Sequence, residues 1–201
     1  MKKTIILLTL LIVSIFSFAQ VNLQSLVKPG AKLIYLVEAN GQKYDFIVTV
    51  KTLTPAPVFD WQMTEPASIS GTITHTATAM VSANALYNYF SPGAKTLDDN
   101  TLSVWISKNS FAALTKGTKS AMITMNTNES PKKMTVTQED PDELHIIVDG
   151  EKETVEEWVA RQQGVSSDDA AYFGFSTSAK IPIILKMNNE FSLLLKEIKT
   201  K

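Results

Sequence analysis

The strongest constraint on the fold is the stretch KLIYLVEANGQKYDFIVTV, residues 32–50, which predicts a β-hairpin. Asn40 and Gly41 both tolerate the positive φ angles that a two-residue type I′ turn requires. With that turn, one face of the hairpin carries only apolar or aromatic pairs, namely Val37 with Tyr44, Tyr35 with Phe46, and Leu33 with Val48. The opposite face pairs Glu38 with Lys43, two opposite charges. Turn residues and hydrophobic pattern therefore indicate the same register.

Further short alternating segments separated by turn residues follow along the chain, and they predict an antiparallel sheet. Short helices are expected between Ala79 and Phe90 and from Ser107 to Gly117. The predicted fold is mainly β, an antiparallel curved sheet or an open or half β-barrel with one or two short helices. The predicted strands are VFDWQMT, SISGTITH, TLSVWIS, AMITMN, MTVTQ and LHIIV.

Residues 154–164, TVEEWVARQQG, are compatible with two conformations. Val155, Trp158 and Val159 would share one face of a helix. Val155, Glu157 and Val159 would instead share one face of a strand. The periodicity does not separate these alternatives, and the conformation of this segment stays open.

The closing segment IPIILKMNNEFSLLLKEIK, residues 181–199, predicts a second hairpin. A two-residue loop at Asn188-Asn189 would place Lys186 opposite Phe191 and mix polar with apolar side chains. A three-residue loop over residues 188–190 gives one wholly apolar face, so we favour it. Its pairs are Met187 with Phe191, Leu185 with Leu193, and Ile183 with Leu195.

Residues 1–19 have the pattern of a cleaved signal peptide. Lys2 and Lys3 precede an apolar run, and Ser17-Phe18-Ala19 supplies small residues at the cleavage site. The run is too short for a membrane span, which needs about 20 apolar residues. We therefore expect an exported protein, periplasmic or extracellular, whose residues 20–201 form a single β-rich domain without a further membrane span.

Charge and composition exclude several classes of function. Removing the leader takes away two of the 19 basic residues, and the remaining 17 face 20 acidic ones without forming a basic stripe. Nucleic-acid binding is therefore not expected, because phosphate contacts need clustered Lys and Arg. The chain has no cysteine, so neither disulfides nor a lipid-anchoring cysteine can form.

No catalytic, cofactor-binding or metal-binding residues can be assigned from motifs. The two histidines, His75 and His145, lie in predicted strands, where a structural role is the favoured interpretation. There is no Gly-x-Ser-x-Gly motif and no Gly-rich phosphate-binding loop. The acidic segment EDPDELH, residues 139–145, offers ligand types for a metal but does not match the spacing of a calcium loop.

The two ends of the chain resemble a known family. The leader, an early GAKLIY strand, and a final PIILKM strand followed by SLLLKEI are similar to the TapB-like exported proteins of unknown function. These motifs cover about a third of the chain. The resemblance implies an antiparallel β-rich exported domain and brings no catalytic residues with it.

The remaining functional candidate is the apolar face of the sheet. If the sheet curls, its concave face would carry Tyr35, Phe46, Trp61, Trp105, Met187 and Phe191, and it would either be filled or leave room for a small ligand. The leading hypothesis is a non-enzymatic protein that binds an apolar or amphipathic molecule. The alternatives are a structural or partner-docking protein of the cell envelope and an extracytoplasmic hydrolase built around His75 or His145. The oligomeric state is not predicted.

Overall fold

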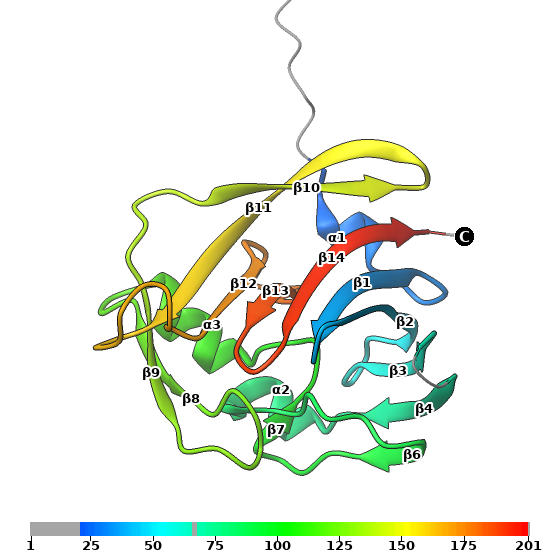
Figure 1. Ribbon diagram of the computed structural model, residues 1–201, viewed down its shortest axis with the longest axis horizontal. Helices are drawn as coiled ribbons and strands as arrows, with labels where there is room; N and C mark the ends of the chain where they lie inside the picture. The colour runs from blue at the N-terminus through cyan, green and yellow to red at the C-terminus, as the bar shows by residue number, and fades with distance from the viewer. Residues whose placement is uncertain (1–20, 66–67, 201) are drawn as a thin grey trace, which may run out of the picture.

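The computed structural model describes residues 21–65 and 68–200. The fold is mainly β, as the sequence predicts, and it contains three short helices where one or two were expected (Figure 1). The predicted signal peptide, residues 1–19, lies outside the described residues. None of the helices in the described part of the chain is long and apolar enough to cross a membrane.

The secondary structure consists of short strands with helices inserted before β1, before β5 and before β8. The helices are α1 (Leu23–Leu26), α2 (Ala77–Ser82) and α3 (Lys108–Thr115). The strands are β1 (Lys32–Ala39), β2 (Gln42–Thr52), β3 (Val58–Met63), β4 (Ile69–Thr74), β5 (Ala85–Leu86), β6 (Gly93–Thr96), β7 (Thr101–Leu102), β8 (Ser120–Ile123), β9 (Lys132–Val136), β10 (Asp142–Val148), β11 (Glu151–Gln162), β12 (Tyr172–Ser176), β13 (Ile184–Asn188) and β14 (Ser192–Lys199).

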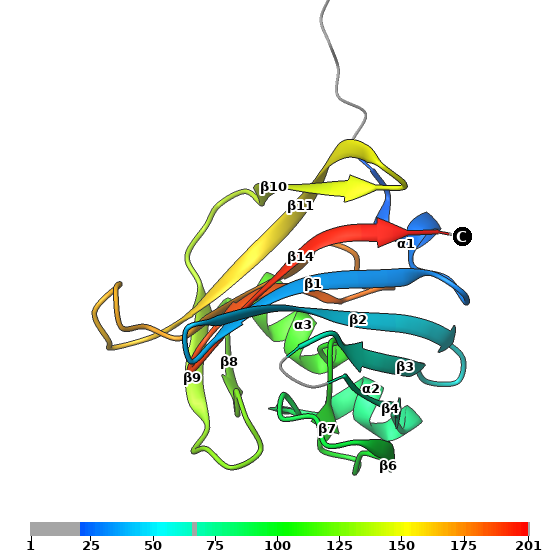
Figure 2. The same ribbon diagram turned by 45° about the vertical axis from the view of Figure 1, so that its right-hand side comes forward.

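Twelve of the described strands form one sheet in the order β6-β4-β3-β2-β1-β14-β13-β12-β11-β9-β8. The twelfth strand, β10, pairs with both β11 and β14, so the strands β10 to β14 close into a five-stranded barrel. The barrel is mixed because β10 runs parallel to β14. Figure 2 shows β14, β1, β2 and β3 following one another outward from this barrel.

Irregular pairing helps this large sheet to bend. The register shifts between Ile34 and Tyr35 where β1 pairs with β14, and between Gly174 and Phe175 where β12 pairs with β13. A further shift lies between Val50 and Thr52 of β2. Such bulges increase the local twist and bend a strand, which favours closure and curvature.

The first hairpin has the predicted register. Leu33 pairs with Val48, Tyr35 with Phe46, and Val37 with Tyr44. On the other face, Lys43 Nζ lies 2.6 Å from Glu38 Oε1. The turn residues Asn40 and Gly41 have φ angles of 51° and 74°. The local sequence pattern was sufficient here because both strands and the turn between them are adjacent in the chain.

The register predicted for the closing hairpin is wrong by two residues. Met187 pairs with Leu193, and Asn188 pairs with Ser192, so the loop consists of residues 189–191. Because the shift is an even number, the side chains keep the faces that the pattern assigned to them. The Asn189 side chain bonds to Glu129 and Lys132, contacts from a distant segment that the hairpin sequence does not reveal.

The predicted helix between Ala79 and Phe90 is shorter than expected, since α2 ends at Ser82. The residues after it form β5, which pairs in parallel with β7. The helix expected from Ser107 is confirmed, because the Ser107 hydroxyl caps α3 by accepting a hydrogen bond from Ser110 N at 3.2 Å. Residues 88–92 are left as an irregular segment that crosses the sheet.

Two further segments were left open or predicted otherwise. The stretch 154–164, which could have been a helix or a strand, lies almost wholly in strand β11, which pairs with β9, β10 and β12. Val155, Glu157 and Val159 are buried at every second position, as the strand alternative predicts. The predicted strand 101–107 survives only at Thr101–Leu102. Val104 has a φ angle of 67°, which ends the extended conformation before Trp105.

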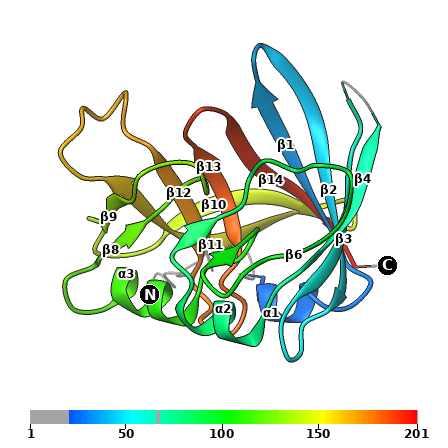
Figure 3. The same ribbon diagram turned by 90° about the horizontal axis from the view of Figure 1, so that it is seen from below.

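The apolar faces meet in two main groups of buried side chains. One lies between β1–β3 and the segments around Tyr87 and Trp105, and the other lies below β12 and β13 around α3. Figure 3 shows the three helices at one end of the molecule and the turns of the β1–β2 and β13–β14 hairpins at the opposite end. The core is therefore closed by helices at one end, while hairpin turns surround the other.

Candidate functional site

A cavity of about 620 Å³ lies on the concave side of β1, β2, β13 and β14. Its walls are mainly apolar and aromatic, with a few neutral polar side chains and one acidic residue. The lining residues are Tyr35, Val37, Ala39, Asn40, Tyr44, Phe46, Met63, Asn88, Tyr89, Phe90, Ser91, Ser103, Val104, Ile184, Met187, Glu190, Phe191 and Leu193.

Strand alternation produces the wall contributed by the first hairpin. Tyr35, Val37 and Ala39 lie at every second position of β1 and therefore point to the same face. Tyr44 and Phe46 of β2 stand beside them in the paired strand. The hairpin turn at Asn40 contributes to the rim, so the cavity opens toward the end of the molecule that the helices leave uncovered.

The irregular segment 88–91 forms the opposite wall. Phe90 packs against Phe46 with ring centroids 4.5 Å apart and against Trp61 at 5.0 Å. Asn88 Nδ2 donates to the backbone carbonyl of Met125 at 2.5 Å and lies 3.5 Å from Met187 Sδ. These contacts hold the segment across the concave face, so the space beneath it has walls on both sides.

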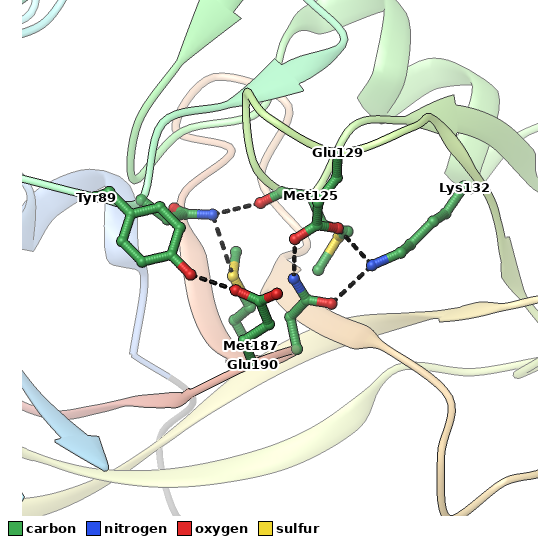
Figure 4. A network of polar contacts seen from close by, with 8 residues as sticks. Tyr89, Met125, Glu129, Lys132, Met187 and Glu190 are labelled. Carbon is green, nitrogen blue, oxygen red and sulfur yellow. Dashed lines mark hydrogen bonds and ion pairs between the residues drawn. The ribbon is translucent and has the colours of Figure 1, made fainter. Parts of the chain in front are cut away.

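Polar contacts connect this segment to the closing hairpin at the rim of the cavity (Figure 4). The Tyr89 hydroxyl donates a hydrogen bond to Glu190 Oε2. Asn189 Nδ2 donates to Glu129 Oε1 at 2.6 Å, and Lys132 Nζ lies 2.5 Å from Glu129 Oε2 and 2.8 Å from Asn189 Oδ1. The hydrogen bond to Glu190 raises the pKa of the Tyr89 hydroxyl above its usual range.

Two buried hydroxyl groups stand deep in the wall. The Tyr35 hydroxyl donates to the backbone carbonyl of Ile184 at 2.9 Å, and complete burial raises the pKa of this hydroxyl. Ser103 is 1% exposed, and its Oγ has no hydrogen-bond partner among the described residues. The inner wall is thus a low-dielectric surface with few groups that could bind a strongly polar ligand.

The structure brings four of the six predicted ligand-lining residues together. Tyr35, Phe46, Met187 and Phe191 all line the cavity. Trp61 and Trp105 are not among the lining residues and belong to the buried core. Trp105 packs against Phe59 and His75 because the turn at Val104 redirects the chain there. Whether the four wall residues contact a ligand stays a prediction.

Sequence reasoning missed the residues of the crossing segment and of the closing turn. Asn88, Tyr89, Phe90 and Glu190 line the cavity but belong to no regular strand. The cluster Tyr87, Tyr89 and Phe90 directly before Ser91-Pro92-Gly93 is the available signal, since three aromatic rings next to a turn suggest a covering segment. Their position over Phe46 depends on tertiary contacts.

His75 is held by the backbone on both sides of its ring. Nδ1 lies 2.8 Å from the Pro57 carbonyl, and Nε2 accepts from the Ser103 backbone N–H at 3.0 Å. This pattern fits the neutral ring protonated on Nδ1, and burial lowers its pKa to about 4. With both nitrogen atoms engaged, the ring has no position left from which to take a proton from a serine hydroxyl.

His145 is exposed on β10, and its Nδ1 lies 3.0 Å from Thr154 Oγ1. It does not belong to the cavity wall. Within residues 21–65 and 68–200, no three His, Asp or Glu side chains are placed together to hold a metal ion. The main feature of the described geometry is the partly open apolar cavity.

Comparison with known proteins identifies no protein similar to this one. No family model matches the chain, and no curated protein and no solved structure is significantly similar to it. The resemblance of the terminal strands to the TapB-like proteins stays a prediction, and the function has to be argued from the geometry of the cavity.

Proposed function

We propose that this protein is a non-enzymatic binding protein that takes up an apolar or amphipathic small molecule in the cavity between the curved sheet and residues 88–91. The observation that carries the proposal is an open space of about 620 Å³ with predominantly apolar walls. Ligand sites for small molecules typically have volumes of about 300–1,000 Å³, with apolar walls and few polar groups. If side chains filled the interior of the curved sheet, there would be no room for a ligand.

The shape of the cavity supports the same function. Its inner wall is rigid, since it consists of paired strands and buried rings. Its rim is formed by two hairpin turns and by Tyr89, which is 49% exposed. A ligand can therefore enter between the turns without unfolding the core. Combined with the predicted leader, this suggests a carrier or sensor outside the cytoplasm.

The test is binding of hydrophobic molecules by the purified protein. Native mass spectrometry should detect a co-purified small molecule, and an environment-sensitive apolar dye should gain fluorescence with a saturable, near-stoichiometric isotherm. An unliganded mass together with no dye uptake would refute the proposal.

A cavity-filling variant makes the test specific. Ala39→Trp places an indole in the cavity wall and should abolish dye uptake while the protein stays folded. Ala112→Trp, on the exposed face of α3 and outside the cavity, introduces the same side chain as a control and should bind as the unmodified protein does. Equal dye uptake by both variants would place the binding elsewhere.

The second candidate is partner docking through a sheet edge. Strand β6 is the outermost strand on one side, and its four residues are all exposed. Exposed edges can accept a strand from another protein. A partner that still binds Ala39→Trp but no longer binds when β6 carries Ala94→Pro would favour docking over ligand uptake.

A further inference from the structure

The charge of the cavity rim is unbalanced. Of the lining residues, only Glu190 is charged, and no Lys or Arg contributes to the wall. Lys43 and Lys196, two of the lysines on the adjoining strands, are already paired with Glu38 and Asp45. The cavity therefore presents one carboxylate, at its mouth, and otherwise neutral groups.

The Glu190 carboxylate is only partly engaged. Oε2 accepts the hydrogen bond from the Tyr89 hydroxyl, while Oε1 accepts none from the described residues. No described Lys or Arg forms an ion pair with Glu190. The neighbouring Glu129 is in a different situation, because Lys132 and Asn189 both bond to it. The uncompensated negative charge at the mouth thus belongs to Glu190.

The aromatic ring of Tyr89 stands next to this carboxylate, and further rings line the same cavity. Tyr89 and Phe191 meet edge to face with centroids 6.4 Å apart, and Tyr44 lines the same cavity from β2. The faces of such rings attract cations, and a carboxylate beside them strengthens that attraction. An anionic headgroup would instead meet the Glu190 charge without any basic partner, because the Lys132 ammonium is occupied by Glu129 and Asn189.

We propose that the cavity selects an apolar molecule carrying a positively charged amine, with the apolar body against the half-buried Tyr44, Phe90 and Leu193 and the ammonium group beside Glu190 at the mouth. This inference rests on the proposed uptake of a small ligand and narrows its chemical class. A fatty-acid-like anion is disfavoured by the same geometry that favours the cation.

The test compares three ten-carbon probes, namely decyltrimethylammonium, decanol and decanoate, by calorimetric titration below the micellar concentrations of the two ionic probes and the solubility limit of decanol. We expect the ammonium probe to bind about fivefold to tenfold more tightly than decanol, with decanoate the weakest. The preference should shrink at high salt, since part of it is electrostatic. Equal affinity for all three probes would overturn the inference but leave the uptake of apolar ligands intact.

Two substitutions that each remove one negative charge test whether Glu190 causes the preference for the ammonium probe. Glu190→Gln should lower the affinity for the ammonium probe to about that for decanol. Glu143→Gln removes an exposed carboxylate on β10, away from the cavity, and should retain the full preference. If Glu190→Gln keeps the preference, the inference is wrong. If none of the three probes binds the unmodified protein, the proposed function fails with it.

Discussion

The Tyr35 hydroxyl of β1 donates a hydrogen bond to the carbonyl of Ile184, a residue 149 positions later in the chain, at a distance of 2.9 Å. This bond joins the first hairpin to β13 across the inner wall of the cavity. Both groups are buried, so neither can exchange its partner for bulk water.

Removing that hydroxyl should destabilise the fold. We expect Tyr35→Phe to lower the free energy of unfolding by about 1–3 kcal/mol, because it leaves a buried carbonyl without this donor. Tyr89→Phe is the matched control, since Tyr89 is exposed and its acceptor Glu190 remains in water. Urea unfolding of both variants checks the prediction, and equal losses would contradict it.

Because the His75 ring is buried, we expect the free energy of unfolding to depend on pH. The ring is protonated below about pH 6.5 in the unfolded chain, whereas burial lowers its pKa to about 4 in the fold. Between these values the unfolded state binds more protons, so the free energy of unfolding falls as the pH decreases. The loss should reach about 3 kcal/mol near pH 4.

The measurement is urea unfolding between pH 7 and pH 4, compared with His75→Gln. This variant is less stable at pH 7 but lacks the titrating ring, so its stability should depend less on pH. Parallel pH profiles for the two proteins would show that His75 does not titrate in this way. Carboxylates contribute equally to both profiles and cancel in the comparison.

Gly174 leaves room for a buried ion pair between β11 and β13. A Cβ atom at this position would overlap the Glu157 carboxylate and lie 2.9 Å from Lys186 Cγ. Glu157 is 1% exposed and forms an ion pair with Lys186. Gly174→Ala should therefore displace the carboxylate and cost about 3 kcal/mol in unfolding experiments.

A double-mutant cycle separates this clash from other effects. In the Glu157→Ala background the overlap is gone, and Lys186 can turn toward water because it is partly exposed. The additional cost of Gly174→Ala should then be much smaller. Additive losses would indicate that the glycine matters for another reason.

Gly41 offers a contrasting test, because its role is conformational. A Cβ atom added there would meet nothing within 4 Å, yet the residue has a φ angle of 74°. Gly41→Ala should cost about 1 kcal/mol through backbone strain alone. Thermal unfolding would reveal it, with the exposed neighbour Gln42→Ala as control. A neutral Gly41→Ala would mean that the turn relaxes to another type.

The sequence predicted the parts of the fold whose partners are close along the chain. The register of the first hairpin, the start of α3 at Ser107 and the mainly β architecture all follow from turn residues and hydrophobic alternation. The closing hairpin shows the limit of this reasoning. Its faces were predicted, but its register differs by two residues, and the turn makes contacts to Glu129 and Lys132 that the hairpin sequence does not reveal.

The cavity was only partly predictable. Alternation along β1 and β2 places Tyr35 and Phe46 on one face, whatever covers that face. The exclusion of Trp105 from the wall and the placement of Phe90 over Phe46 depend on where distant segments cross the sheet. The alternation of side chains indicates which face of the sheet is apolar. It does not indicate how far residues 88–91 lie from that face.

The amino-acid sequence by itself thus determined the β-strands, their apolar faces and the turns between neighbouring strands. These features depend on backbone preferences and on residues that are close together in the chain. Only the tertiary structure decided that β10 closes a barrel, that residues 88–91 leave a space above the sheet, and that Glu190 stands at its mouth. Those features arise from packing between segments far apart in the chain, where small differences in side-chain volume and hydrogen bonding select one arrangement among several that share the same local pattern.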